Sequence, residues 1–312
     1  MSTFSLVTTC KDRLDHLKQS LPSMISQGFH EVIVVDYDCP QGTSKWICAN
    51  HPSVIVVKVE NEPLFNVSKA RNVGAARSSG DMLCFVDADV VLAVGYLGWF
   101  ANHFVQNNFY ILGVGTPVCT RAQFETVGGY DDVIAGWGGE DWDFCLRLRE
   151  AGYDLKLFPE ELVKERIQHS DRMRTAYYDV KDKRSSMLRA RYYIAAKQKL
   201  KSVSGVGAIP RSLRESLYLQ TEQISSDNRG FKETTARSLC FEVELRPKNE
   251  RARHQRIVFS ISRKEAKYWE RVRDEMKQPK RLGFVRSRYE WLKRALPKWY
   301  RQIGVADRTQ ID

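Results

Sequence analysis

The first half of the chain alternates short apolar, β-branched runs with amphipathic helical patterns, and this alternation restricts the fold more than any other feature. Four such runs are predicted to be strands: residues 4–9, 31–37, 53–61 and 81–89. Helical patterns lie between them, at 13–28 and 66–80. Because strands that alternate with helices build βαβ units, the prediction is an α/β domain with a Rossmann-like, mostly parallel sheet and helices on both faces.

Two carboxylates follow the fourth predicted strand. In "LCFVDADVVL" the apolar run stops at Asp87 and Asp89 comes two residues later, so both side chains point to the same side of an extended chain. Ligands of such sheets bind at the carboxyl ends of the strands. Two charges buried there need a cation or hydrogen-bond donors to compensate them. A Mg²⁺ or Mn²⁺ site is one interpretation, and a solvated acidic turn is the other.

A second acidic motif, "GGEDWDF", places Glu140, Asp141 and Asp143 at the start of a predicted helix that stops at Gly152. Acids at a helix N-terminus interact favourably with the helix dipole and cap free N–H groups, so a cap is the alternative to a catalytic carboxylate. His169, in "ERIQHSD", is one of six histidines. It is either a structural side chain or a ligand, and a mixed aspartate, histidine and phosphate shell would favour Mn²⁺ over Mg²⁺.

The charge of the chain is divided between its two halves. Residues 1–160 hold 12 Lys and Arg against 19 Asp and Glu, whereas residues 161–312 hold 37 against 19. A divalent metal suits the acidic half, and an anionic partner suits the basic half. Seven scattered cysteines without a CxxC pair argue against a disulfide framework and a structural zinc site. With neither a signal peptide nor a long apolar span in the sequence, we expect a cytoplasmic protein.

The last third of the sequence has a different pattern from the first half. A long basic helical stretch at 174–200 precedes a linker, and the rest is predicted to hold a hairpin, at 239–247 and 256–262, and basic helical segments, at 263–278 and 286–304. We therefore predict a catalytic domain at 1–200 and a basic α+β or helical C-terminal extension at 201–312.

The final predicted helix carries an approximate apolar stripe, formed by Leu292, Ala295, Leu296, Trp299 and Ile303. Such a stripe among basic residues either lies on an anionic membrane surface or docks onto the catalytic domain.

Several motifs, taken in order, resemble one enzyme family. The strand before "TTCKDR", the strand ending "VVDYD", the helix "NVSKARNVGAARSSGD", and then "FVDAD", "GGEDWDF" and "IQHSD" are similar to the GT-A glycosyltransferases. The likeness is to the family 2 type whose catalytic domain ends like the β-1,4-galactosyltransferases, and it covers about residues 3–175. It implies a GT-A fold, a nucleotide-sugar donor, and Mn²⁺ or Mg²⁺ as cofactor.

The resemblance also implies a role for each matching position. Asp87 would contact the ribose or the sugar of the donor, and Asp89 would ligate the metal that bridges the donor phosphates, with His169 as the second protein ligand. Asp141 would be the catalytic base, and Glu140 would hydrogen-bond sugar hydroxyls. Other matching positions would line the donor pocket: Thr8, Arg13, Asp36, Arg71, Asn72, Trp137 and Gly138. Asp38 is an alternative to Asp36 as the acid beside the base of the nucleotide.

The predicted function is a metal-dependent, inverting glycosyltransferase. It would move a sugar from a nucleotide-diphosphate sugar, with UDP favoured, to a glycan or lipid-linked acceptor in surface-polysaccharide assembly. An anionic membrane surface as partner would place the protein peripherally on the inner face of the cytoplasmic membrane. A sugar-nucleotide nucleotidyltransferase is an alternative, although no Gly-rich phosphate loop follows the first strand. The other alternative is a nucleic-acid-binding protein that acts through the basic C-terminal part. Nucleic acid is disfavoured as a partner, because the sequence holds no binding motif for it and the acidic half would repel a polyanion.

Overall fold

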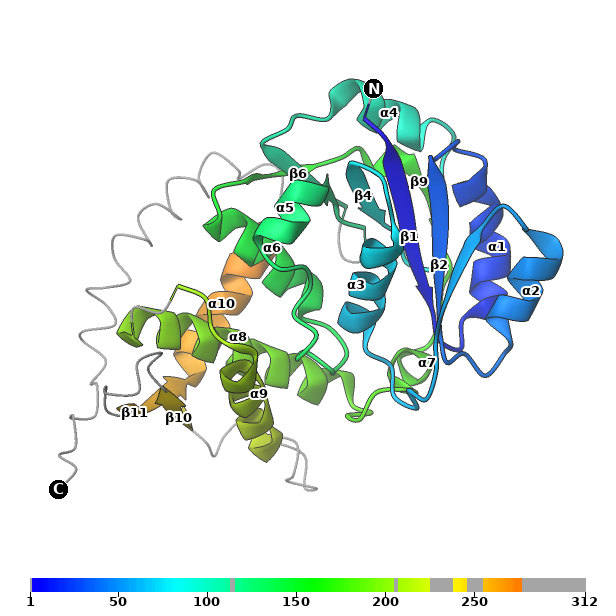
Figure 1. Cartoon of the computed structure of the whole chain (residues 1–312). Coiled ribbons are helices and arrows are strands. Elements are labelled where there is room, and N and C mark those ends of the chain that lie inside the picture. The colour runs from blue at the N-terminus through cyan, green and yellow to red at the C-terminus, as the bar shows by residue number, and fades with distance from the viewer. Residues whose placement is uncertain (1, 113–115, 205–206, 225–237, 246–254, 277–312) are drawn as a thin grey trace. The chain divides into compact units, whose positions relative to one another are not determined.

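The chain forms two compact units, one up to Lys183 and one from Arg184 onward (Figure 1). The computed structural model describes residues 2–112, 116–204, 207–224, 238–245 and 255–276.

The first unit is built on a seven-stranded sheet. In spatial order the strands are β3 (Ile55–Val59), β2 (Glu31–Tyr37), β1 (Phe4–Cys10), β4 (Met82–Phe85), β7 (Val118–Thr120), β6 (Asn108–Ile111) and β8 (Asp154–Leu157). β1 to β4 are mutually parallel, β6 is parallel to β8, and only β7 runs antiparallel to its neighbours. The predicted α/β fold with a mostly parallel sheet is therefore confirmed.

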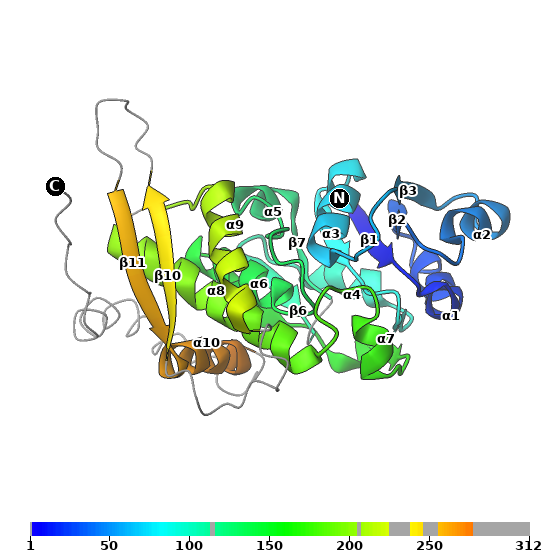
Figure 2. The same ribbon diagram turned by 90° about the horizontal axis from the view of Figure 1, so that it is seen from below.

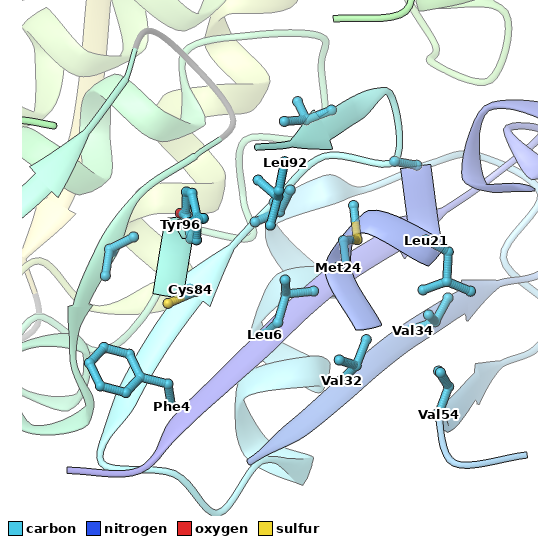
Figure 3. Packing of buried hydrophobic residues seen from close by; sticks show 14 of the residues in the cluster. Phe4, Leu6, Leu21, Met24, Val32, Val34, Val54, Cys84, Leu92 and Tyr96 are labelled. Atoms are coloured by element: carbon cyan, nitrogen blue, oxygen red, sulfur yellow. The ribbon is translucent and has the colours of Figure 1, made fainter. Parts of the chain in front are cut away.

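Both faces of the sheet are covered, because successive side chains of a strand point in opposite directions. Leu6 of β1 and Val34 of β2 pack in one apolar cluster with Leu17 and Leu21 of helix α1 (Leu14–Ile25), as Figure 3 shows in part. Val7 and Val35, the next residues of the same strands, instead contact helix α3 (Val67–Arg77). All seven residues of β1 are buried, which is typical of a central parallel strand.

The first unit also contains a small second sheet, in which β5 (Val90–Leu92) pairs antiparallel with β9 (Val163–Arg166). Its other helices are α2 (Thr43–Asn50), α4 (Tyr96–His103), α5 (Arg121–Thr126), α6 (Glu140–Glu150) and α7 (Asp171–Thr175), with a 3-10 turn at Glu160–Leu162. The strands β5, β6 and β7 are absent from the sequence-based prediction, because each has only three or four residues.

The second unit combines helices with a hairpin. Its elements are α8 (Lys183–Ser204), α9 (Arg211–Gln220), a 3-10 turn at Thr221–Ile224, β10 (Ser238–Leu245), β11 (Gln255–Ser262) and α10 (Arg263–Met276). β10 and β11 pair antiparallel side by side (Figure 2), so the predicted hairpin and the helix after it are confirmed. A buried ion pair between Lys199 of α8 and Glu265 of α10, with 2.9 Å between Nζ and Oε1, holds this unit together.

The predicted continuous helix at 174–200 is wrong, because the structure breaks it between α7 and α8. Tyr178 is buried in the break and packs against Phe65, with 5.7 Å between the ring centroids. The hydroxyl of Thr175 donates to the carbonyl of Lys181 at 2.6 Å, which closes the turn. Tertiary packing thus overrides the helical propensity of this stretch.

Two further predictions concern the second half of the chain. The predicted domain boundary at 200 falls inside α8, whereas the compact units divide after Lys183. The predicted helical segment at 286–304, with its apolar stripe, lies outside the described residues. Within the described residues, the structure contains no helix with the length and apolar character to cross a membrane.

Candidate active site

One buried arginine connects the two acidic motifs. Arg71 of α3 is only 3% exposed. Its guanidinium donates to Asp87 Oδ1 at 2.9 Å and to Asp141 Oδ1 at 2.7 Å, and it lies 3.6 Å from Glu140 Oε1. It also lies over the ring of Tyr130, 5.0 Å from the centroid, and the Tyr130 hydroxyl donates to Asp141 Oδ1 at 3.3 Å. Residues that are distant in the sequence therefore form one hydrogen-bonded cluster.

The start of helix α6 positions the second acidic motif. Gly139 takes the N-cap position with φ of 97°, a left-handed conformation that favours glycine, and the acids fill the first turn after it. Asp143 is buried and pairs with Arg147 one helical turn later, at 2.8 Å between Oδ2 and Nε. The three acids therefore have different surroundings, because only Glu140 and Asp141 face Arg71.

The cluster contains more carboxylates than cations, and this raises the pKa of some of them. Burial raises the pKa of Glu140 to about 8, and the charge of Asp141 acts in the same direction while Arg71 opposes it. Burial also raises the pKa of Asp87 to about 7, against the effect of Arg71 and with that of Asp89. Glu140 is therefore mostly protonated at neutral pH. The cluster is short of positive charge, which a bound cation would supply.

Asp89 and His169 form the second half of the site. Asp89 lies in the turn between β4 and β5, and its carbonyl accepts a hydrogen bond from the backbone N–H of Ile167 at 2.8 Å. The pairing of β5 with β9 thereby brings His169 to within 2.8 Å of Asp89, measured from Nε2 to Oδ2. His169 Nδ1 is buried and has no hydrogen-bond partner among the described residues. The predicted pair of metal ligands is thus brought together.

The donor set at this pair fits a divalent metal that is completed by a substrate. One carboxylate and one imidazole suit Mn²⁺. In the part of the chain that the structure describes, no cluster of three or more His, Cys, Asp or Glu side chains could hold a metal ion. Ions of this class commonly take one or two protein ligands and fill the remaining positions with water and substrate phosphates. The protein side of the site therefore fits a metal bound together with a phosphorylated ligand.

Asp87 and Asp89 line a cavity of about 550 Å³, a volume in the usual range for small-molecule sites. Its wall also carries three cations, Lys164, Arg166 and Arg174, which no local sequence pattern indicates. The full lining is Asp87, Asp89, Leu112, Glu160, Val163, Lys164, Glu165, Arg166, Ile167, Gln168 and Arg174. Acidic side chains suit a bound metal ion and basic side chains suit phosphate, so this lining suits a phosphorylated ligand that binds together with a metal ion.

His16 of α1 is a further neighbour of the site that the sequence analysis missed. Its ring lies 5.2 Å from that of His169, centroid to centroid. Burial lowers the pKa of His16, and Arg13 and His169 act in the same direction. Nothing in the sequence around His16 distinguishes it from a surface histidine of an amphipathic helix, so only the fold reveals this contact.

Two predicted donor-pocket residues, Thr8 in β1 and Arg13 at the start of α1, differ in their hydrogen bonds. Thr8 is buried, and its hydroxyl has no hydrogen-bond partner among the described residues. Arg13 directs its guanidinium to two backbone carbonyls, that of Asp12 at 2.8 Å and that of Met173 in α7. Arg13 therefore connects the start of α1 to the segment that follows His169.

Asp36 and Asn72 have structural partners. Asp36 accepts hydrogen bonds from the backbone N–H groups of Cys39 at 3.0 Å and Ser44 at 2.8 Å, and from the Ser44 hydroxyl. It thus organises the loop after β2. The amide of Asn72 donates to the carbonyl of Tyr130 at 2.9 Å and accepts from its N–H at 2.8 Å. Asn72 thereby holds the residue whose ring lies under Arg71.

The loop before α6 carries the remaining predicted residues. Gly138 has φ of 81°. The ammonium of Lys183 lies 4.7 Å from the centroid of the Trp137 ring. An aromatic ring and glycines with left-handed backbone therefore precede the acids, as the sequence predicts.

Comparison with known proteins finds several solved structures that are similar to this chain. Solved structures similar to this chain include the mannosyltransferase PcManGT from Pyrobaculum calidifontis in complex with GDP-Man and Mn²⁺, with 16% identity, 72% of each chain covered and a TM-score of 0.47. Another is S. aureus TarS 1–349, with 15% identity, 75% of each chain covered and a TM-score of 0.48. A third is a Drosophila β1,4-galactosyltransferase 7 mutant with manganese, UDP-Gal and xylobiose, with 18% identity, 56% of this chain and 74% of that chain covered, and a TM-score of 0.42.

No curated protein matches the chain. Residues 101–174 match a family model described as the N-terminal domain of galactosyltransferase. This segment contains Glu140, Asp141 and His169, and it begins after Asp87 and Asp89. The match agrees with the galactosyltransferase-like segment that the sequence analysis expects in the second half of residues 3–175.

Proposed function

We propose that the chain is a metal-dependent, inverting glycosyltransferase that takes a sugar from a nucleotide-diphosphate donor. The observation that carries this proposal is the contact of one buried side chain, Arg71, with both Asp87 and Asp141. It links the acid that would contact the donor to the acid that would act on the acceptor. Such a link suits a reaction in which both substrates must be oriented together.

The donor would bind with its diphosphate in the cavity that Asp87 and Asp89 line. Asp89 and His169 would hold Mn²⁺ or Mg²⁺, which would neutralise the charge of the departing diphosphate. The cations of the cavity wall, Lys164, Arg166 and Arg174, would add to this neutralisation. The family matched at 101–174 favours a hexose and a UDP-linked donor.

Asp141 would be the base that takes the proton of the acceptor hydroxyl. Its Oδ1 is held by Arg71 and Tyr130, which orients the carboxylate at the start of α6. Glu140, protonated at neutral pH, would hydrogen-bond a sugar hydroxyl, and Trp137 would offer it an aromatic face. Direct attack by a hydroxyl that Asp141 deprotonates would invert the configuration of the anomeric carbon.

The acceptor is proposed to be a glycan or a lipid-linked glycan in surface-polysaccharide assembly, at the inner face of a membrane. The excess of Lys and Arg in residues 161–312 supports an anionic surface as partner.

The test is the melting temperature of the purified protein with UDP, GDP, TDP and CMP sugars, with and without Mn²⁺. A ligand that binds only the folded state stabilises it by about 2.7 kcal/mol at a concentration one hundred times its Kd. We expect a Mn²⁺-dependent rise with one class of nucleotide sugar and its loss in Asp89→Ala. The control is Asp15→Ala, which removes an exposed carboxylate from α1. The proposal fails if no nucleotide sugar is bound or hydrolysed in the presence of Mn²⁺.

A further inference from the structure

Two cysteines meet where the neighbouring strands β1 and β2 end. Cys10 is the last residue of β1, and Cys39 lies in the loop after β2. Their sulfur atoms are 4.0 Å apart. Cys10 is fully buried, whereas Cys39 is partly exposed, so a small molecule from solvent reaches Cys39 first.

The surroundings distinguish the two sulfur atoms chemically. The backbone N–H of Asp12 donates to Cys39 Sγ at 3.2 Å. The Cys10 thiol, and then Thr43 and the backbone of Gln41 and Asp12, lower the pKa of Cys39 to about 5 against the effect of burial. The same hydrogen bond, followed by burial, raises the pKa of Cys10 above its usual value. These surroundings favour the thiolate form of Cys39 and the thiol form of Cys10, which would then donate to it.

We propose that Cys10 and Cys39 form an oxidation site that reacts with a peroxide and closes into an intramolecular disulfide. The Cys39 thiolate would attack one peroxide oxygen, which gives a sulfenic acid and releases hydroxide. Cys10 would then attack Cys39 Sγ and form the S–S bond, while the sulfenic oxygen leaves as water with the Cys10 proton. In total, two thiols and one hydrogen peroxide give one disulfide and two waters.

Closing the disulfide requires the two sulfur atoms to approach each other. A disulfide has an S–S distance of about 2 Å, roughly half the present separation. The pair is flanked by Asp12 and Asp38, whose φ angles of 53° and 48° lie in the left-handed region that non-glycine residues rarely occupy. Lys11, which is buried, donates to the carbonyl of Asp38 at 3.0 Å. A shift of Cys39 therefore disturbs a tightly connected segment.

Residues predicted to line the donor pocket lie within three residues of the pair along the chain: Thr8 in β1, Arg13 at the start of α1 and Asp36 in β2. The second part of the inference rests on the proposed function. It is that the disulfide weakens binding of the nucleotide sugar. The oxidised form would then be inactive until a thiol reductant restores it. This regulation acts at the donor site and leaves the acidic cluster around Arg71 in place.

The chain allows a direct test, because trypsin places the three relevant cysteines in separate peptides. Cleavage after Lys and Arg puts Cys10 in residues 1–11, Cys39 in 19–45 and Cys48 in 46–58. The reduced full-length protein is treated with graded hydrogen peroxide, alkylated, digested and analysed by mass spectrometry. We expect a cross-linked pair of the first two peptides that lacks two hydrogens and disappears with dithiothreitol.

Variants show whether the pair reacts as proposed. Cys10→Ser should abolish the cross-linked peptide and leave Cys39 as a sulfenic acid that dimedone labels. Cys39→Ser should abolish both products. Cys48→Ser, which changes an exposed cysteine of α2, should leave the cross-link unchanged. The proposal is overturned if peroxide converts Cys39 of the wild type to sulfinic acid without a cross-link to Cys10, or if Cys39 stays reduced while Cys48 is oxidised.

The effect on the donor site is measured separately. The Kd of the nucleotide sugar is compared for the reduced, oxidised and re-reduced protein, and we expect the oxidised form to bind about tenfold or more weakly, with recovery after reduction. An unchanged Kd in a fully cross-linked sample would overturn the link to donor binding. If the reduced protein binds no nucleotide sugar, the proposed function fails, and the cross-linked peptide alone decides whether the thiol pair is an oxidation site.

Discussion

At the scale of single residues, Arg71 is the centre of the site. A guanidinium can donate in several directions from one plane, which lets Arg71 bond Asp87 and Asp141 at the same time. A buried cation of this kind is stable only while its anions are present, and the anions depend on it in turn. The two acidic motifs are therefore coupled through the protein before any substrate binds.

The roles of the two acids at the start of α6 can be separated by isosteric substitution. Asp141→Asn removes the proposed base and should lower kcat by about 10²–10⁴-fold, with the Kd of the donor unchanged. Glu140→Gln should have a much smaller effect on kcat at neutral pH, because glutamine resembles the protonated form that Glu140 already adopts. Steady-state kinetics and donor titration measure both quantities. Loss of turnover in Glu140→Gln with normal turnover in Asp141→Asn would reverse the two assignments.

Removal of the arginine should be costly for stability as well as activity. Arg71→Met leaves Asp87, Glu140 and Asp141 without their shared cation, and breaking a buried ion pair in this way costs about 3–5 kcal/mol. Arg71→Lys should cost less, because it keeps the charge but not the geometry that reaches two carboxylates. Arg77→Met, at an exposed position of the same helix, is the control and should change stability by less than about 0.5 kcal/mol. Urea unfolding measures all three, and equal losses for Arg71 and Arg77 would contradict this argument.

At the scale of elements, helix α3 approaches the sheet closely enough to present Arg71 to the acids. Gly74, one turn after Arg71, lies directly against Val7 of β1 and Val35 of β2, and a side chain there would overlap both. The absence of a Cβ at this position thus sets how near α3 lies to the sheet.

Gly74→Ala should therefore destabilise the first unit by about 1–3 kcal/mol, because the helix must move away from the two valines. The matched control is Gly98→Ala in α4, where the added methyl group meets open space. There the higher helix propensity of alanine should leave stability unchanged or raise it by up to about 1 kcal/mol. Thermal or urea unfolding distinguishes the two glycines, and a neutral Gly74→Ala would show that α3 can shift without cost.

Local sequence patterns predict the parts of the site that each element carries by itself. The end of an apolar run locates Asp87, and the start of a helical pattern locates Glu140 and Asp141. The opening of α3 at Asn66 is also predicted, and its side chain accepts from the Lys69 N–H. The contacts of Arg71 were not predictable in this way, because they join helix, strand end and loop through the packed sheet.

Other structural features were not predicted from the sequence, each for a different physical reason. His16 joins the site only because α1 packs beside the segment that follows β9. β6 and β7 are too short for an alternating pattern to indicate them. The break between α7 and α8 depends on the burial of Tyr178 against Phe65, which is a tertiary contact that the helical propensity of the stretch does not reveal.

At the scale of the whole molecule, a few acids from distant parts of the sequence meet in the first unit: Asp87, Glu140 and Asp141 lie around Arg71, and Asp89 lies beside His169. The pKa of Glu140 is raised from its usual value of 4.5 to about 8 in the fold. Near neutral pH the folded cluster therefore holds a proton that the unfolded chain has released. The site therefore couples the protonation of a few side chains to the stability of the folded unit.

This coupling predicts how stability depends on pH. Between about pH 4.5 and 8 the folded state holds a proton on Glu140 that the unfolded state has lost. The stability that Glu140 contributes is therefore complete below pH 4.5 and is lost as pH rises to about 8, at up to about 1.4 kcal/mol per pH unit. Glu140→Gln should remove this slope, so that the stability of the variant relative to that of the wild type rises by on the order of 4 kcal/mol from pH 4.5 to 8.

The control for the pH dependence is Glu31→Gln. Hydrogen bonds from Ser5, Ser79 and Gly80 lower the pKa of Glu31 although burial opposes them. Above about pH 5.5 Glu31 is therefore ionised in both the folded and the unfolded state, and its removal should shift the stability curve there without changing the slope. Urea unfolding at a series of pH values measures each slope. An equal slope in wild type and Glu140→Gln would mean that Glu140 is ionised in the fold, and then Glu140, and not only Asp141, could act as a base at neutral pH.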